Sequence, residues 1–170
     1  MKKTFVFIFI VSTMLFGSIA YASSGFLDVP ENHYAYEAIK SVKTYGIING
    51  YPGNIFKPND LISRAEMAVL MCRMSGEDVS LSANPFSDVP DTHWARGYIT
   101  KANEKGIILG NGKGLFRPDD FVTYEEAVKM AVMATGKASA VGIYPEGWSQ
   151  SFIKIASLSK ITDNLQTLSG

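Results

Sequence analysis

A short motif in the first half of the chain combines groups that can bind an anion. Ser63 and Glu66 form a capping box at the start of a segment with helical spacing. Arg64, in the first helical turn, opposes the helix macrodipole and so does not help the helix locally. An arginine beside the free amides of a helix start is, however, a good receptor for a carboxylate or phosphate. We therefore expect Arg64 to bind an anion, with a surface ion pair to a nearby carboxylate as the alternative.

Two aspartates and two tryptophans are further candidates for ligand contacts. Asp28 and Asp88 each precede a turn, where the carboxylate either closes an Asx turn or contacts a polar ligand. Trp94 and Trp148 occupy equivalent slots in different parts of the chain. A large ring there either packs at a junction or presents its face to a ligand, and packing is the favoured interpretation.

No pattern in the sequence indicates catalysis or a metal centre. A Gly-x-Ser-x-Gly elbow and a Walker-type phosphate loop are both missing from the sequence. Glu125 and Glu126 are neighbours on a predicted helix and so point in different directions, unlike a carboxylate pair across a cleft. His33 and His93 lack a second metal ligand three or four residues on. We expect a protein that is not an enzyme and that has neither a cofactor nor a metal.

The elements that position these residues come from an internal duplication. With a shift of 60 residues, segment 26–76 aligns with 86–136 without a gap, and 16 of the 51 positions are identical. Each copy begins with Phe-x-Asp-Val-Pro and continues with apolar residues at helical spacing, Ala35, Ala38 and Ile39 in the first. A glycine then ends the helix, and two isoleucines and a glycine-rich loop follow. The isoleucine pairs are either very short strands or buried extended chain.

A second helix is predicted in each copy, and a third copy begins near the end of the chain. The second helices start at Ser63 and Thr123, each with glutamate three residues on, and end at Gly76 and Gly136. With a shift of 54 residues, segment 148–161 matches the first helix of the second copy. Units of this size bury their apolar faces by stacking, so the sequence predicts a mostly α-helical fold of helix-loop-helix repeats.

The first residues have the layout of a secretory signal peptide. Lys2 and Lys3 precede an apolar run, and small residues in an Ala-x-Ala arrangement end at Ala22. The run is shorter than the roughly 20 residues that span a bilayer, so we expect an exported protein without a membrane partner after cleavage. The 16 basic and 16 acidic residues become 14 and 16, which gives no broad positive field for nucleic acid. Cys72, the only cysteine, lies among apolar residues and is predicted to be buried.

The repeated motifs resemble the S-layer homology (SLH) domain family. The resemblance is carried by segments 26–30 and 86–90, 33–35 and 93–95, 46–50 and 106–110, 56–60 and 116–120, and 62–66. It implies a pseudo-threefold prism of three repeats with a helical core, whose grooves bind a secondary cell-wall polymer that often carries pyruvate ketals. The family's Thr-Arg-Ala-Glu motif is matched by Ser-Arg-Ala-Glu at Ser63, whereas the second copy has Thr-Tyr-Glu-Glu at Thr123 and lacks the arginine.

The predicted organisation follows from the repeats and the resemblance. A signal peptide occupies 1–22, SLH-like repeats occupy 23–82 and 83–140, and a partial third repeat occupies 141–170. An incomplete third unit leaves open a homo-oligomer in which another chain completes it. The predicted glycan-binding residues are Arg64, Glu66, Asp28, Asp88, Trp94 and Trp148.

The resemblance implies attachment without catalysis. An exported protein would be held at the cell wall or cell surface of a Gram-positive bacterium through an anionic, pyruvylated secondary cell-wall polysaccharide linked to peptidoglycan. Two alternatives stay open. One is a structural or protein-interaction module that has lost glycan binding, and the other is the anchoring part of a longer extracellular enzyme.

Overall fold

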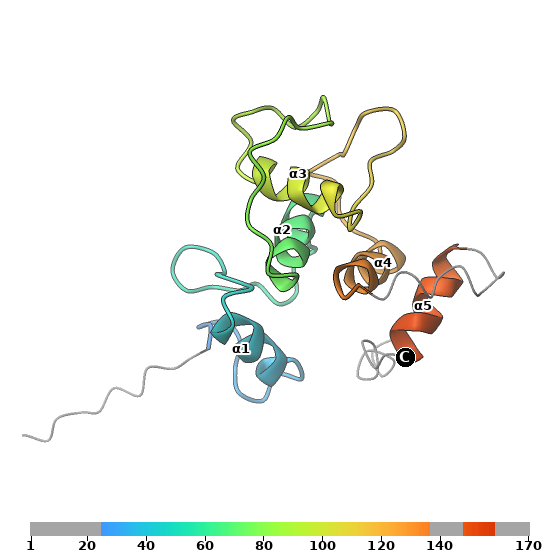
Figure 1. Cartoon of the computed structure of the whole chain (residues 1–170). Helices are drawn as coiled ribbons and strands as arrows, with labels where there is room; N and C mark the ends of the chain where they lie inside the picture. The colour runs from blue at the N-terminus through green and yellow to red at the C-terminus, as the bar shows by residue number, and fades with distance from the viewer. Residues whose placement is uncertain (1–24, 137–147, 159–170) are drawn as a thin grey trace, which may run out of the picture.

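The computed structural model describes residues 25–136 and 148–158 of the 170-residue chain. The predicted signal peptide and the opening turn of the third repeat lie outside the described residues. Five helices make up the regular structure of the described part (Figure 1): α1 (Tyr36–Thr44), α2 (Arg64–Met74), α3 (Arg96–Glu104), α4 (Tyr124–Ala134) and α5 (Trp148–Leu158). None of them is long and apolar enough to cross a bilayer. The prediction of a mostly α-helical repeat fold is confirmed.

The helices pair across the repeat boundaries. The first helix of the second repeat, α3, packs against α2, which is the second helix of the first repeat. In the same order α5 packs against α4, and α2 and α4 are themselves in contact. Figure 1 shows α2 in the centre, with α4 between α2 and α5. Each repeat therefore buries its apolar face against its neighbour, as expected for stacked units.

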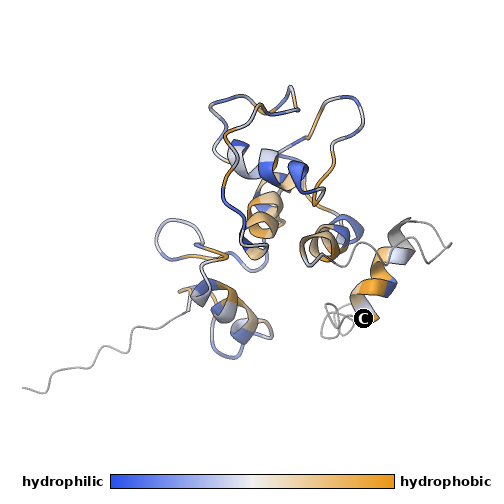
Figure 2. Cartoon of the chain, viewed as in Figure 1, coloured by the Kyte–Doolittle hydropathy of each residue, from blue (hydrophilic) through white to orange (hydrophobic). Residues whose placement is uncertain are grey.

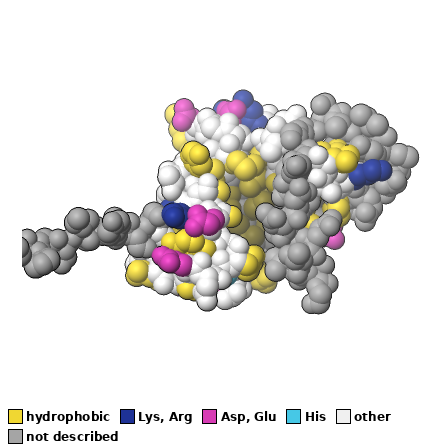
Figure 3. Space-filling model, turned by 90° about the horizontal axis from the view of Figure 1, so that it is seen from below, with side chains coloured by type: hydrophobic (Ala, Val, Ile, Leu, Met, Phe, Trp, Pro, Cys, Tyr) yellow, Lys and Arg dark blue, Asp and Glu magenta, His cyan; other side chains and the backbone are white. Residues whose placement is uncertain are grey.

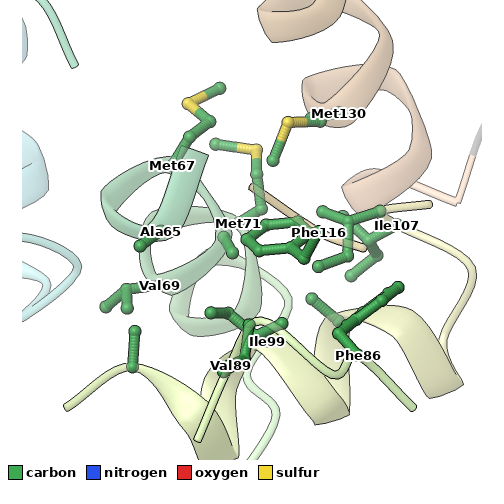
Figure 4. Packing of buried hydrophobic residues seen from close by; sticks show 14 residues of the cluster. Ala65, Met67, Val69, Met71, Phe86, Val89, Ile99, Ile107, Phe116 and Met130 are labelled. Carbon is green, nitrogen blue, oxygen red and sulfur yellow. The ribbon is translucent and has the colours of Figure 1, made fainter. Parts of the chain in front are cut away.

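The largest core lies where α2, α3, α4 and the loop of the second repeat meet. Figure 4 shows Met71 of α2 beside Met130 of α4, with the Phe116 ring near Met71, and Met67 belongs to the same core. Unbranched methionine side chains fill irregular gaps between helices. The central helix, α2, is apolar over most of its surface and buried on most sides (Figure 2). Cys72 of α2 is fully buried, which confirms the prediction of a core residue.

Both second helices begin with the predicted capping box. The Ser63 hydroxyl accepts the N–H of Glu66, and the Thr123 hydroxyl accepts the N–H of Glu126. Each glutamate carboxylate in turn accepts the N–H of its own cap residue. A box of this kind satisfies two amides that have no partner inside the helix and stabilises the helix start by about 1 kcal/mol. The four glycines predicted to end helices all have positive φ, between 68° and 72°, as expected for C-terminal caps.

The isoleucine pairs are largely buried and lie outside any strand of the described part. Ile107 and Ile108 are buried, and neither belongs to a strand in the described part of the chain. Two isolated β-bridges occur elsewhere in the described loops. The glycine-rich loop that follows the isoleucines needs its first glycine, because a Cβ at Gly110 would lie 2.5 Å from the Phe86 ring. The loop is thereby packed closely against the opening turn of its repeat.

The first helix is packed less completely than its counterpart in the second repeat. A small separate core holds it in place, formed by Phe26, Val29, Ile39 and Ile48. No helix of the described part lies along α1, and Leu70 of α2 contacts its small core, whereas α3 packs along α2. Ala38, which helical spacing placed on the buried face, is therefore exposed.

Candidate functional site

The start of α2 is docked onto the loop of the second repeat. The backbone amides of Arg64 and Ala65 donate to the carbonyls of Asp120 and Pro118, at 2.8 and 2.9 Å. Ser63 and Phe121, the neighbours of Arg64 and Asp120 in the chain, form an isolated β-bridge. The sequence predicted free amides beside Arg64, and that prediction is wrong because the second repeat supplies acceptors for them. An anion in this region must bind to side chains instead.

The Arg64 side chain points into the molecule and is held by several groups. Its Nε donates to the carbonyl of Phe116 at 2.9 Å. Its terminal nitrogens donate to the carboxylate of Glu126 at 3.0 Å and to the carbonyl of Leu109 at 3.2 Å. The guanidinium carbon lies 4.8 Å from the centre of the Phe116 ring, which adds a cation–π contact. Arg64 is only 7% exposed and the Glu126 side chain is 30% exposed, so their ion pair is partly buried rather than the surface pair considered from the sequence.

The electrostatic setting of Arg64 combines burial with nearby charges. Burial lowers the pKa of Arg64 from its usual value, the Glu126 charge opposes this, and the Arg117 charge lowers the pKa further. The guanidinium nevertheless stays protonated, because arginine keeps its proton under the conditions in which proteins are folded. A second cation, Arg117, therefore acts on the same region.

Glu126 connects the two repeats. One carboxylate oxygen accepts the N–H of Thr123 at 3.1 Å, as part of the capping box. The other oxygen accepts Arg64, which lies 62 residues earlier in the chain. The sequence indicated only the capping role of Glu126, because the second partner is close only in the folded chain.

A cleft of about 220 Å³ opens beside Arg64 at the junction of the two repeats. Its lining consists of segment 107–111, Arg64, Arg117 and three residues of α4, which are Glu126, Lys129 and Met130. Three cations and one carboxylate thus line the cleft, and a second carboxylate, Asp120, pairs with Arg117 next to this lining. On the face seen in Figure 3, basic and acidic side chains lie in small groups, some of them side by side, around hydrophobic ones. Neither sign of charge therefore forms a broad patch among the described residues on that face.

Arg117 and Lys129 were not among the residues predicted from the sequence. Arg117 is half exposed and pairs with Asp120 at 3.2 Å. A signal for it was present, because a basic residue also follows the phenylalanine of the first-repeat loop, at Lys57. Lys129 lies with its Nζ 5.7 Å from the centre of the Phe152 ring of α5. Its position at the cleft depends on how α4 packs, which local sequence does not reveal.

Asp28 and Asp88 bind the backbone of their own repeats. The Asp88 carboxylate accepts the N–H groups of Phe116 and Arg117, at 2.8 and 2.7 Å. Asp28 accepts the two equivalent amides of the first repeat, at 2.8 and 2.6 Å. Burial alone would raise the pKa of each carboxyl group, but the backbone amides outweigh it and hold the pKa below its usual value. Neither aspartate lines the cleft, so their predicted contact with a glycan stays a prediction.

The predicted tryptophans are not part of the described cleft lining. Trp94 is 63% exposed, and its ring stacks on the His93 ring with 5.8 Å between centroids. His93 in turn accepts the N–H of Ala95 through Nδ1. Trp148 is the first residue of α5, and its side chain lies outside the described residues. Of the predicted residues whose side chains are described, Arg64 is the one that lines the cleft, and the binding roles of the others stay predictions.

Glu66 has a different partner from Glu126. One oxygen caps Ser63, and the other accepts the hydroxyl of Tyr51 at 2.6 Å. This bond to a carboxylate raises the pKa of Tyr51 to about 12. The Nζ of Lys57 lies 4.7 Å from the centre of the Tyr51 ring. Glu66 therefore bonds a tyrosine of its own repeat, whereas the equivalent Glu126 bonds Arg64 of the preceding repeat.

Comparison with known proteins gives consistent matches to this architecture. The family model of the S-layer homology domain matches residues 25–68 and 85–128. The chain is 31% identical over 136 residues to the middle cell wall protein of Brevibacillus brevis, a match that covers 77% of this chain and 12% of that protein. It is 37% identical over 83 residues to the cellulosome-anchoring protein of Acetivibrio thermocellus, which covers 46% of the chain and 19% of that protein. A match to an endoglucanase of Bacillus sp. (strain KSM-635) has 33% identity over 109 residues and covers 64% of the chain and 11% of the enzyme.

The relatives are much longer than the matched region. The matched regions span 12%, 19% and 11% of the three relatives, so the chain corresponds to a small part of each. The two family matches fall on the two complete repeats, and together they make up about half of the chain. They include the start of α2 with Arg64 and the start of α4 with Glu126, which form the junction described above. The resemblance inferred from the repeated motifs is confirmed, and the chain belongs to the S-layer homology domain family.

Proposed function

We propose that this chain attaches an exported protein to the bacterial cell wall, without catalysis, by binding an anionic secondary cell-wall polymer in the cleft beside Arg64. The observation that carries the proposal is the cleft, which Arg64, Arg117 and Lys129 line together with Glu126 at the junction of two family repeats. The names of relatives, a cell wall protein and a cellulosome-anchoring protein, support a location at the cell surface or wall. A pyruvylated sugar offers a compact carboxylate of the kind that such a cleft attracts.

Arg64 and Arg117 have different roles in the proposed binding. Arg64 is largely committed to Phe116, Leu109 and Glu126, so it supplies a fixed positive charge at the base of the cleft. Arg117 is half exposed and can turn its planar guanidinium toward a ligand carboxylate, which it binds through two parallel hydrogen bonds. Partial burial strengthens these interactions relative to water. In this arrangement the exposed side chain of Leu109 would contact the sugar ring, because Ile107 and Ile108 are buried in the core.

In this proposal the protein stays attached because it binds reversibly to a long polymer. A single cleft of this size binds one short stretch of sugar with modest affinity. Several molecules on one polymer, or several repeats in one polypeptide, raise the effective affinity without any new contact.

Binding to purified cell-wall sacculi tests the proposal. We expect the protein to sediment with intact sacculi, to stay in solution when the secondary polymer has been removed chemically, and to bind less tightly as salt is raised. Unchanged sedimentation after removal of the polymer would assign the partner to peptidoglycan instead. A folded protein that stays in solution with intact sacculi would overturn the proposal.

A second candidate is a structural or protein-interaction module. The observation that favours it is Tyr124, which is 48% exposed at the position that corresponds to Arg64 in the first copy. The start of α4 thus lacks the motif arginine. Self-association of the folded protein, combined with no binding to sacculi, would favour this candidate. The endoglucanase among the relatives supports a further version of the attachment proposal, in which the attached protein is an enzyme.

A further inference from the structure

One carboxylate holds the turn that forms part of the cleft. Asp88 accepts the N–H of Phe116 at 2.8 Å and the N–H of Arg117 at 2.7 Å, so each of its oxygens is engaged by one of two adjacent amides. Asp88 belongs to the opening turn of the second repeat, 28 residues before Phe116. The turn is therefore fixed by a distant side chain.

The turn has a backbone conformation that must be held. Arg117 has a φ of 61°, in the left-handed region that residues with a side chain rarely adopt. An ionised carboxylate that receives two amides is a strong acceptor and can hold such a turn. Burial alone would raise the pKa of Asp88, but the amides outweigh it and the pKa lies below its usual value, so Asp88 is charged at neutral pH. Backbone strain that is held in this way is typical of binding sites.

Two cations of the cleft depend on this turn. The carbonyl of Phe116 accepts the Nε of Arg64 at 2.9 Å, and the Phe116 ring lies 4.8 Å from the guanidinium carbon. The next residue, Arg117, lines the cleft with its own side chain. A rotation of the turn would move the support of one cation and also the other cation itself.

We propose that Asp88 is a positioning residue of the cleft, which does not contact the ligand but holds the turn of Phe116 and Arg117 so that Arg64 and Arg117 face one bound anion. The consequence for binding rests on the proposed function above. This role differs from the direct glycan contact expected from the sequence, because Asp88 does not line the cleft.

The first repeat supplies a matched control. Asp28 accepts the N–H groups of Phe56 and Lys57 at 2.8 and 2.6 Å. Lys57 has a φ of 64°, close to that of Arg117. None of these first-repeat residues lines the cleft. Asp28→Asn therefore weakens the same kind of turn without touching the cleft.

The test compares Asp88→Asn with Asp28→Asn in three measurements: urea unfolding, NMR spectra of the ligand-free protein, and binding to sacculi. We expect both variants to lower the urea midpoint by similar amounts. Asp88→Asn alone should shift the Nε–H resonance of Arg64. It should also weaken binding about tenfold, the size expected for loss of a charge-assisted hydrogen bond. Asp28→Asn should leave binding within about twofold of the wild type, a result that would also count against the direct glycan contact expected for Asp28 from the sequence.

A double variant separates the geometry of the turn from the charge of the arginine. Glycine adopts positive φ freely, so Arg117→Gly in the Asp88→Asn background should bring the Arg64 resonance back toward its wild-type position without restoring binding. An unshifted Arg64 resonance in Asp88→Asn, or equal losses of binding in the two aspartate variants, would overturn the positioning role. If the wild-type protein does not bind sacculi, the proposed function fails, and the Arg64 resonance still decides whether Asp88 holds the turn.

Discussion

The two repeats use the same glutamate in different ways. In each repeat one carboxylate oxygen caps the second helix. The other oxygen of Glu66 accepts the hydroxyl of Tyr51, from the same repeat, at 2.6 Å. The other oxygen of Glu126 accepts Arg64, from the preceding repeat, at 3.0 Å. The glutamate at the start of α2 therefore has a neutral tyrosine as its partner. The glutamate at the start of α4 has an arginine as its partner and lines the cleft.

The consequence of this change is a different charge at each helix start. Tyr51 is neutral over the physiological range, and its ring is covered on one side by Lys57. Arg64 is a permanent cation, and it brings the second repeat's loop and α4 together around it. The start of α4, with Arg64 beside it, is therefore suited to an anion. The start of α2 is not, because Tyr51 already bonds its glutamate.

Glu126→Gln is expected to have the largest effect on the stability of the fold. Glutamine still caps Thr123, but Arg64 is left as a buried charge without a counter-charge. Breaking a buried pair costs roughly 3 kcal/mol or more; since Glu126 is 30% exposed, we expect a loss of about 2 kcal/mol in the free energy of unfolding by urea.

Glu66→Gln is the matched control for that measurement. The partner of Glu66 is a neutral hydroxyl, so the loss should stay below about 1 kcal/mol. Equal losses in the two variants would contradict the claim that the charge of Glu126 is what holds Arg64.

Arg64→Lys is expected to have an intermediate effect. Lysine keeps a charge opposite Glu126, but it lacks the planar fork that bonds the carbonyls of Phe116 and Leu109. We expect a loss of about 1–2 kcal/mol in the free energy of unfolding. Arg73→Lys in the same helix is the control, since the Arg73 bonds are long, at 3.4 Å, and the expected loss is within about 0.5 kcal/mol. Similar values for the two variants would show that the fork of Arg64 does not matter.

The smallest effect is expected from Tyr51→Phe, and it depends on pH. The pKa of Tyr51 is raised to about 12, mainly by its bond to Glu66. A folded pKa above the unfolded value of 10.0 means that the stabilisation is complete below about pH 10 and is lost as the pH rises through about 12. We expect a loss of about 1 kcal/mol or less at pH 8 and a shrinking difference above pH 10. In Glu66→Gln, the Tyr51 titration followed by NMR should move toward 10.0, and an unchanged titration would count against the bond.

Features that depend on neighbours in the sequence were predictable. The capping boxes and the glycine helix ends involve residues a few positions apart, and each was found where the repeats predicted it. The repeat itself predicted that helices would stack, and the pairing of α3 with α2 follows that expectation. Ala38 is the exception, because the helical spacing could not show that α1 lacks a covering helix in the described part.

The site was predictable only in part, because its partners are far apart along the chain. Arg64 drew attention through its conflict with the helix dipole, which is a local signal. Its acceptors on Leu109, Phe116 and Glu126 lie 45 to 62 residues away, and its backbone amide is satisfied by the loop of the second repeat. The expectation of free amides failed for that reason. The equivalence of Arg117 with Lys57 was visible in the repeats, but nothing local distinguished the one that lines a cleft.

The pair Arg117→Gln and Lys57→Gln tests the binding cleft most directly. Both residues have a left-handed φ, of 61° and 64°, both are half exposed, and both pair with an aspartate three residues on, at 3.2 and 3.5 Å. Of the two, Arg117 lines the cleft and Lys57 does not. In sedimentation with intact sacculi, we predict about tenfold weaker binding for Arg117→Gln and a change of less than about twofold for Lys57→Gln. Equal binding by the two variants, or a loss confined to Lys57→Gln, would contradict the assignment of this cleft as the site of attachment.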